Sequence, residues 1–361
     1  MPGRINPKIA GLTPYQPGKP IDELTRELGI TDVLKLASNE NPRGPGPLVR
    51  QAIDAACGTL SRYPDGNAFA LKAAIAAHLG VKESQLTIGN GSNDVLDLVA
   101  RISLSPGSEA IISEHGFVVY TLATISAGGE LVTVPATDYG ADLQGFLDAV
   151  TDNTALIFLA NPNNPTGTWV NESELTAFLD ALPDHVWVVL DEAYKEYVDA
   201  SAYPDGIALQ RRFPNLIVTR TFSKIHGLAA LRIGYGVSSE QAADLMNRAR
   251  QPFNVNALAM QAAQAALKDQ EFVQESRELN RQGMATLLAG IDALGLEHIP
   301  SVGNFVSLDV GGPARQAYEA LLREGVIVRP VAEYGLPRHL RVTVGLPEEN
   351  QRFLDALGRI L

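Results

Sequence analysis

The chain has 361 residues, 45% of them hydrophobic, which is enough for one large α/β domain or for two domains. Its 41 acidic and 29 basic residues give a net charge of −12, which argues against nucleic acid or an anionic membrane as a partner. A single cysteine excludes a disulfide framework and a cysteine-based metal site, and the six histidines are scattered, so we expect no metal. Apolar runs are too short for a transmembrane helix or a signal peptide, so we expect a cytoplasmic protein.

Residues 1–47 are predicted to form an N-terminal arm. Five prolines and three glycines fall within the first 20 residues and disfavour a helix there. Residues 21–28 have the pattern of a short helix, and residues 38–47 form a loop rich in proline, glycine and asparagine. We expect the arm to pack with a smaller C-terminal domain.

Residues 48–255 alternate between strand and helix patterns. The predicted strands are 85–88, 110–113, 131–134, 155–160, 186–190 and 216–218, and the predicted helices are 48–60, 67–79, 94–102, 118–126 and 172–181. Continuous apolar strands separated by helices predict a mainly parallel sheet covered on both faces. We therefore expect a large three-layer α/β domain that binds its ligand beyond the carboxyl ends of the strands.

Residues 256–361 have a different pattern, which predicts a smaller α+β domain. Helical periodicity extends over residues 261–288, and further helices are predicted at 314–323 and 348–360. Apolar segments at 304–310, 325–330 and 339–345 supply the strands of this domain.

The segment TFSK and the residues after it suggest a phosphate site with an amine inside it. Thr221, Ser223, Lys224 and Arg232 follow a buried strand and combine two hydroxyls, a lysine and an arginine. Lysine forms Schiff bases with carbonyl compounds, so the set suits pyridoxal 5′-phosphate, an aldehyde that carries a phosphate. The alternative is a surface turn with a solvated lysine and an ion-paired arginine.

A second candidate phosphate site is GNGSND, at residues 89–94. It follows a strand and opens a helix, so backbone N–H groups and the helix dipole would face an anion. The last position is Asp94 and not glycine, so the segment is not a dinucleotide-binding fingerprint. The alternative is a turn capped by Ser92 or Asn93.

Two further polar motifs follow buried strands. NPNNPTG, at residues 161–167, would aim a hydrogen-bond donor at a ligand oxygen, or its asparagines would only cap the turn. DEAY begins with Asp191, and a carboxylate at the end of a buried strand is costly unless it has a partner. A protonated pyridine nitrogen would suit it, because this pairing makes the cofactor an electron sink. A helix cap or a salt bridge is the alternative.

These motifs, in this order and at these intervals, resemble the fold-type-I pyridoxal-phosphate-dependent aminotransferases, and most of all the histidinol-phosphate aminotransferase family. The matching segments cover essentially the whole chain and are TPYQPGKP, LASNENP, RYPDG, NPNNPTG, DEAY, TFSKIHGLAALRIGYG, NFV, VRP and LRVTVG. The resemblance implies a transaminase of histidine biosynthesis. It would convert L-histidinol phosphate and 2-oxoglutarate into imidazole-acetol phosphate and L-glutamate.

The resemblance also implies roles for single residues around the cofactor. Lys224 would bond to the aldehyde and later move the proton, and Asp191 would hold the pyridinium. Tyr194 and Asn164 would hydrogen-bond the phenolic oxygen. Phe117 would lie over the ring, with an ordinary core position as its alternative.

The phosphate of the cofactor would be held by residues from two subunits. Those of the same chain are Gly91, Ser92, Asn93, Thr221, Ser223 and Arg232. Tyr63, in RYPDG, would reach the phosphate from the neighbouring subunit, which implies a homodimer with shared active sites.

The residues that the resemblance implies for the substrate carry charge. Arg341 would bind the substrate or glutamate carboxylate, because a guanidinium suits a planar carboxylate. Arg329 would bind the phosphate of histidinol phosphate, or would instead pair with Glu333 or Glu324. Tyr15 would close over that phosphate. The remaining expected pocket residues are Asn39 and Asn304.

The substrate is the least determined feature. Similar patterns belong to aminotransferases of aromatic amino acids, to a decarboxylase of phosphorylated threonine, and to regulators that bind the cofactor without catalysis. The acidic chain and the absence of a DNA-binding extension disfavour a regulator. We expect histidinol phosphate as the substrate, with phenylalanine or tyrosine as the second choice.

Overall fold

The computed structural model describes residues 7–14 and 18–361. In this part of the chain the large sheet has seven strands in the order β2-β8-β7-β6-β5-β3-β4. They are β2 (Leu86–Gly89), β3 (Glu109–Ser113), β4 (Glu130–Val134), β5 (Thr154–Ala160), β6 (Trp187–Asp191), β7 (Leu216–Thr221) and β8 (Gly234–Val237). Strand β8 runs opposite to the other six strands, which share one direction, so the predicted mainly parallel sheet is confirmed.

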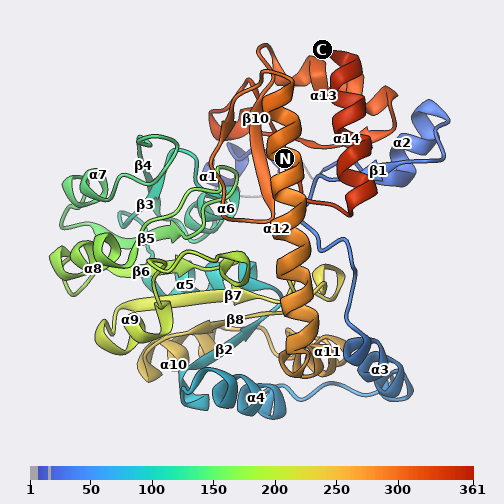
Figure 1. The fold of residues 1–361 in the computed structure, drawn as a ribbon. Coiled ribbons are helices and arrows are strands. Elements are labelled where there is room, and N and C mark those ends of the chain that lie inside the picture. Colours follow the sequence, from blue (N-terminus) through green and yellow to red (C-terminus); the bar gives the residue numbers. More distant parts are fainter. Residues whose placement is uncertain (1–6, 15–17) are drawn as a thin grey trace, which may run out of the picture.

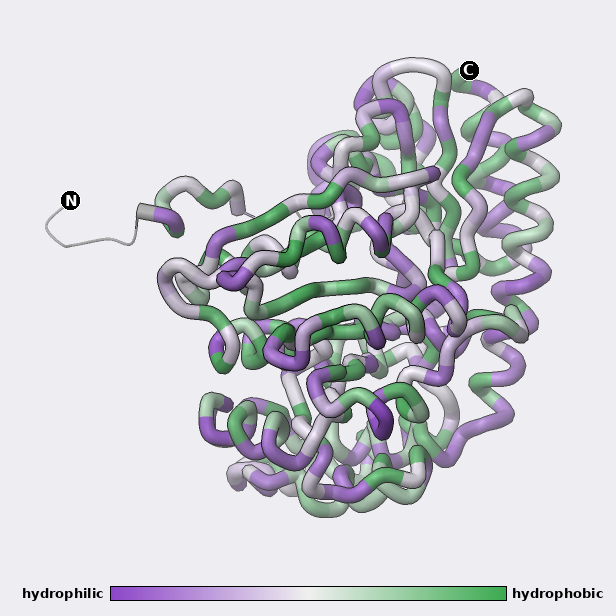
Figure 2. Tube along the Cα trace, turned by 90° about the vertical axis from the view of Figure 1, so that its left-hand side faces the viewer, coloured by the Kyte–Doolittle hydropathy of each residue, from purple (hydrophilic) through white to green (hydrophobic). Residues whose placement is uncertain are grey.

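Helices cover both faces of this sheet and make a three-layer sandwich (Figure 1). One face packs against α3 (Pro47–Ala56), α4 (Phe69–Leu79), α7 (Leu143–Asp148), α8 (Glu172–Ala181), α9 (Gly206–Arg212) and α11 (Ala257–Lys268). The other face packs against α5 (Ser92–Ser103), α6 (Val118–Ser126) and α10 (Glu240–Ala249). The central strands are drawn mostly green in the hydropathy view, because both of their faces are buried (Figure 2).

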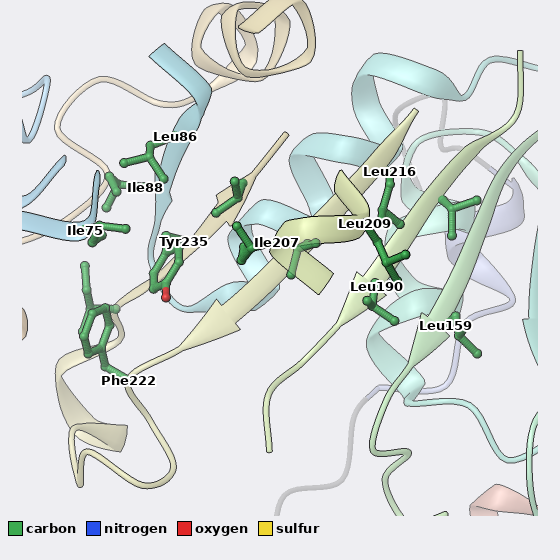
Figure 3. Packing of buried hydrophobic residues seen from close by; sticks show 14 of the residues in the cluster. Ile75, Leu86, Ile88, Leu159, Leu190, Ile207, Leu209, Leu216, Phe222 and Tyr235 are labelled. Atoms are coloured by element: carbon green, nitrogen blue, oxygen red, sulfur yellow. The ribbon is translucent and has the colours of Figure 1, made fainter. Parts of the chain in front are cut away.

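Side chains of the central strands alternate between the two cores. In β6, Val188 and Leu190 belong to one cluster, whereas Val189 belongs to the other. Figure 3 shows the first cluster, where Leu190 and Leu216 lie near Ile207 and Leu209 of α9. This period of two decides which face each polar residue at the strand ends will take.

The predicted smaller α+β part is confirmed as a second sheet covered by helices. Its antiparallel strands are, in spatial order, β12 (Arg329–Pro330), β13 (His339–Thr343), β10 (Phe305–Asp309) and β9 (His298–Ile299). They pack with α12 (Gln270–Ala293), α13 (Ala314–Arg323) and α14 (Pro347–Ile360) around a separate apolar cluster. Helix α12 runs from the large sheet up to this smaller part (Figure 1).

The described part of the arm contacts both halves of the molecule. It contains α1 (Pro7–Ala10), α2 (Ile21–Leu28) and β1 (Leu34–Lys35). Strand β1 pairs in parallel with β11 (Val326–Ile327) of the smaller part, and Lys8 donates to the carbonyl oxygens of Gly128 and Gly129 beside the large sheet.

Two features of residues 256–288 were not expected from the sequence. The periodicity over residues 261–288 is two helices, because the chain turns at Asp269 between α11 and α12. Helix α11 packs on α3 and α4 in the core of the large sheet, although the predicted domain boundary after residue 255 would place it in the smaller part. The division into 1–47, 48–255 and 256–361 stays a prediction.

Strand β8 and helices α7, α9 and α10 were not predicted. Two glycines interrupt the apolar pattern of β8, and its place between β2 and β7 comes from pairing with strands distant in sequence. Helices α7 and α9 have 6 and 7 residues, which is too short for a clear periodic signal. No helix within residues 7–14 and 18–361 is both long enough and apolar enough to cross a membrane.

The ends of β6 and β7 carry two polar pairs on opposite faces. Thr219 lies opposite Asp191 in the strand register, and its Oγ1 donates to Asp191 Oδ1 at 2.9 Å. One residue later the pleat turns the side chains over, and Arg220 Nε donates to Glu192 Oε2 at 2.8 Å. Glu192 is fully buried and Arg220 nearly so. The second pair therefore belongs to the core and not to the cavity described below.

We expect Glu192→Ala to destabilise the fold strongly, because it leaves the Arg220 guanidinium buried without its carboxylate. Breaking one side of a buried pair costs about 3–5 kcal/mol, and Glu192→Gln, which keeps a hydrogen-bond acceptor, should cost less. Urea unfolding measures both. Glu240→Ala, which removes the exposed partner of Lys82, is the control and should leave the midpoint nearly unchanged. Equal midpoints for Glu192→Ala and this control would contradict the assignment.

Candidate active site

A cavity of about 160 Å³ lies at the carboxyl ends of β5, β6 and β7, where the two sheets meet. Thirteen of the residues expected from the sequence line it, and they are Asn39, Ser92, Asn93, Phe117, Asn164, Asp191, Tyr194, Thr221, Ser223, Lys224, Arg232, Arg329 and Arg341. The structure thus brings together residues that are up to about 300 positions apart in the chain.

Three expected residues have other places, and a fourth lies outside the described residues. Gly91 is the N-cap residue of α5, and Asn304 Nδ2 donates to the carbonyl oxygen of Asn39 at 3.1 Å. Neither is among the residues that line the cavity, and the place of Asn304 in the substrate pocket stays a prediction. Tyr63 is on the surface with 84% of its area exposed. Tyr15 lies outside the described residues.

One corner of the cavity is built to hold an anion. Ser92 and Asn93 form the first turn of α5, whose backbone N–H groups and dipole favour negative charge. Thr221 ends β7 and Ser223 lies in the turn after it, and Arg232 Nη1 donates to Ser223 Oγ at 3.3 Å. Hydroxyls, a helix amino end and a guanidinium together fit a phosphate group.

Glycines allow these elements to approach one another. A Cβ atom on Gly91, whose φ is 83°, would lie 2.7 Å from Arg232 Nη2. A Cβ atom on Gly234 would lie 2.4 Å from the backbone nitrogen of Ser92. Side chains at these two positions would push α5 away from the guanidinium, so the anion corner depends on both glycines.

The carboxylate of Asp191 is held from two sides at the base of the cavity. Thr219 occupies one oxygen, and Tyr120 Oη donates to the other, Oδ2, at 2.9 Å. Burial raises the pKa of the Asp191 carboxyl, whereas the bonds from Thr219 and Tyr120 act in the opposite direction. A buried carboxylate placed in this way suits a cationic ligand atom such as a protonated ring nitrogen.

The pKa of the Lys224 amine is lowered, so both its charged and its neutral forms are populated near neutral pH. Burial, followed by the positive charge of Arg341, lowers the pKa of Lys224 to about 7. Its Nζ donates to the carbonyl oxygen of Ser38 at 3.1 Å and lies 5.5 Å from the ring centre of Tyr194. An amine with this pKa can accept a proton near neutral pH.

A polar network fixes the side of the cavity near Tyr194. Asn39 Nδ2 donates to Tyr194 Oη at 2.9 Å, and the backbone nitrogen of Asn39 donates to Thr343 Oγ1 at 2.9 Å. Arg341 donates to Asn164 Oδ1 and, at 2.7 Å, to the carbonyl oxygen of Ala37. The arm loop, the large sheet and β13 are thus joined at one wall.

Two buried arginines face each other across β12 and β13. Arg329 is the register partner of Arg341, and both line the cavity. Arg329 is ion-paired with Glu333, which is the alternative that the sequence had left open for it. The two guanidiniums bring positive charge to the cavity lining, although the whole chain is acidic.

Several residues of this site were not predicted from the sequence. Tyr120 and Thr219 hold Asp191, and Ser38, Tyr334 and Gly18 also line the cavity. The signal for Thr219 was available, because it alternates with Thr221 along β7 and therefore shares its face. Tyr120 lies one helical turn after Phe117, a spacing that also places two side chains on one face.

The chain resembles known proteins over almost its full length. Residues 31–357 match the family described as aminotransferase class I and II. The histidinol-phosphate aminotransferase 2 of Pseudomonas fluorescens (strain Pf0-1) is 56% identical over 357 residues, which is 98% of this chain and 96% of that protein.

Solved structures show the same similarity. The structure of histidinol-phosphate aminotransferase from Sinorhizobium meliloti in complex with pyridoxal-5′-phosphate has a TM-score of 0.92 and 33% identity, covering 99% of this chain and 97% of that one. A Thermus thermophilus aspartate aminotransferase has a TM-score of 0.86, 24% identity and full coverage of both chains, and this likeness concerns the fold alone.

We expect Lys224 to react with an amine-directed acylating reagent in a distinct pH range. Only the neutral amine reacts, so its labelling should reach half its maximum near pH 7 and be complete well below pH 10. The measurement is peptide mass spectrometry on protein freed of bound small molecules. Lys82 is the control, because hydrogen bonding to Glu240 raises its pKa. If Lys224 and Lys82 titrated together, the proposed effect of burial would be absent.

Proposed function

Because this chain belongs to the class I and II aminotransferase family and to its histidinol-phosphate aminotransferases, we propose that it exchanges the amino group between L-histidinol phosphate and 2-oxoglutarate. The resemblance predicted from the motifs is confirmed, and the chain is a transaminase. The observation that carries the choice of substrate is the presence, in one cavity, of Lys224, Asp191 and two buried arginines on adjacent strands. The products would be imidazole-acetol phosphate and L-glutamate, in histidine biosynthesis.

The cofactor that fits this cavity is pyridoxal 5′-phosphate. When bound, it supplies an aldehyde that takes up the amino group and a ring that accepts electrons. The anion corner would hold its phosphate through Ser92, Asn93, Thr221, Ser223 and Arg232. The glycines that keep this corner compact and the carboxylate that suits a ring nitrogen are features of the protein itself, and both support the assignment.

Each residue around the cofactor would have a separate role. Asp191 would stabilise the positive charge of the ring nitrogen, and Tyr194 and Asn164 would hydrogen-bond the phenolic oxygen. Lys224 would hold the cofactor, and its neutral amine would take up and release the proton that moves during amino transfer. Its lowered pKa suits this task, because a base must be unprotonated at the working pH. Phe117 would cover the ring.

The two arginines would bind different anionic groups of the two substrates. Histidinol phosphate has a phosphate and no carboxylate, whereas glutamate has carboxylates and no phosphate. Arg341, held between Asn164 and Ala37, would bind the glutamate carboxylate, and Arg329 would bind the phosphate. Asn39 would line the same pocket, and Tyr15 would close over the phosphate.

A second copy of the chain would complete the site. Tyr63 stacks on Phe253 with ring centres 4.9 Å apart, and 84% of Tyr63 and 47% of Phe253 are exposed. Two adjacent exposed aromatic rings are typical of a surface that another protein covers. In a homodimer Tyr63 would reach the cofactor phosphate of the partner subunit, so each subunit would contribute to both sites.

The test of the function is the steady-state rate of amino transfer from histidinol phosphate to 2-oxoglutarate, measured beside the same reaction with phenylalanine and tyrosine. We expect the highest kcat/KM for histidinol phosphate. The Lys224→Ala variant, prepared free of host enzymes, is the inactive control. Good turnover of phenylalanine without turnover of histidinol phosphate would identify an aromatic amino acid aminotransferase instead.

We expect Arg329→Ala to separate substrates by their phosphate. A hydrogen bond between charged partners contributes about 1.5–3 kcal/mol, so kcat/KM for histidinol phosphate should fall about tenfold to a hundredfold or more. Phenylalanine should be affected much less. Arg341→Ala is the matched variant on the opposite strand and should instead damage the reactions of glutamate and phenylalanine. An equal loss with all substrates in Arg329→Ala would mean that the arginine supports the fold.

We expect Tyr120→Phe to impair catalysis through Asp191. The change removes one of the two hydroxyl donors to the buried carboxylate, which costs on the order of 1.5 kcal/mol, or about tenfold in kcat. Because that bond lowers the pKa of Asp191, its loss raises the pKa and moves the acid limb of the pH–rate profile to higher pH. Tyr139→Phe, at an exposed tyrosine, is the control. A lower kcat without a shift of the acid limb would contradict the role.

A further inference from the structure

Arg329 is linked to the protein surface through an ion pair with Glu333. Arg329 is on β12 and lines the cavity, whereas Glu333 follows four residues later in the 3-10 helix η5 (Ala332–Tyr334). The side chain of Arg329 is 7% exposed and that of Glu333 is 39% exposed. One end of the pair is therefore inside the proposed phosphate subsite and the other end is in contact with solvent.

The negative charge of Glu333 has a physical role when no ligand is bound. Arg329 and Arg341 are register partners on antiparallel strands, so their side chains leave the same face of the sheet. Like charges in this arrangement repel each other, and a buried guanidinium is costly without a counter-charge. Glu333 offsets both effects for Arg329.

We propose that Glu333 is a displaceable counter-ion that the phosphate of the substrate replaces at Arg329, and that its charge sets how tightly this subsite binds phosphate. The inference rests on the proposed function, because it takes Arg329 as the phosphate-binding arginine. Free phosphate must compete with a carboxylate that is tethered beside the arginine. The phosphate of a substrate whose amine is already held in the site arrives at a high effective concentration and displaces the carboxylate more readily.

The exchange requires only the rotation of one side chain. Val331 is fully buried and Tyr334 nearly so, and both pack with Ile299 and Leu336. The carbonyl oxygen of Tyr334 is also 2.6 Å from His115 Nδ1, within hydrogen-bond distance. The backbone on each side of Glu333 is therefore fixed, and the half-exposed carboxylate can turn to solvent without moving the cavity wall.

The carboxylate of Glu333 weakens the binding of phosphate whether its bond to Arg329 is kept or broken. If it keeps its bond, it occupies donors of the guanidinium and repels the incoming dianion. If it leaves, the bond to Arg329 is lost. Removal of the charge should therefore strengthen the binding of phosphate, whereas a residue with a merely structural role would weaken it when changed.

The test compares wild type with Glu333→Gln, a substitution that keeps the shape and removes the charge. Two quantities are measured on the cofactor-loaded enzyme, namely the dissociation constant of inorganic phosphate by calorimetry in phosphate-free buffer, and KM for histidinol phosphate. We expect both to fall about three- to tenfold, as for the loss of a partly exposed competing charge. Glu333→Asp, which keeps the charge, should remain closer to wild type.

Two further variants show where the effect arises. Glu324→Gln removes a carboxylate that pairs with Arg359 and not with the cavity, and it should change neither quantity. In an Arg329→Ala background the gain from Glu333→Gln should disappear, because the two residues act on the same ligand. If the gain persisted without Arg329, Glu333 would act elsewhere and the proposal would be overturned.

The remaining outcomes separate this inference from the proposed function. If Glu333→Gln binds inorganic phosphate as tightly as wild type does, the proposal that Glu333 is a displaceable counter-ion is overturned. If wild type fails to use histidinol phosphate but Glu333→Gln still binds inorganic phosphate more tightly, the substrate assignment fails and the counter-ion at Arg329 stands.

Discussion

The buried carboxylate of Asp191 is the constraint on which this end of the molecule depends. A carboxylate inside a protein is stable only with partners, and here the protein supplies two of them. Thr219 on the adjacent strand and Tyr120 on α6 each donate a hydroxyl, and the cavity faces the remaining side. The strand register and the helix that packs on that face are therefore part of the active-site geometry.

The pleat of the same strands separates two carboxylates that are adjacent in sequence. Asp191 faces the cavity, whereas Glu192 faces the opposite core, where Arg220 neutralises it. Parallel strands buried on both sides make this separation possible, because each face has its own apolar layer. Asp191 is thus available to a ligand in the cavity, whereas Glu192 stabilises the fold through its pair with Arg220.

Two of the four cationic side chains that line the cavity come from the smaller sheet. Arg329 and Arg341 project from β12 and β13, and the charge of Arg341 contributes to the lowered pKa of Lys224. The group that would bind the substrate anion thus also favours the neutral amine that would move the proton. The partly exposed carboxylate of Glu333 pairs with the guanidinium of Arg329 and offsets its charge.

The sequence by itself determined the α/β class, the family and most of the lining residues, because strand ends, glycine turns and the order of motifs are local features of the chain. Helices with strong periodicity, such as α2, α6 and α8, begin and end where the pattern predicts. Only the tertiary structure decided that Tyr120 and Thr219 hold Asp191, that Asn304 donates to the carbonyl oxygen of Asn39, and that Arg329 pairs with Glu333 and not with Glu324. Most of these contacts join residues far apart in the chain, and even the choice between two glutamates close to Arg329 follows from how β12 and η5 are packed. Strand pairing and core packing bring such side chains within hydrogen-bond distance, and neither is encoded in the spacing of residues along the chain.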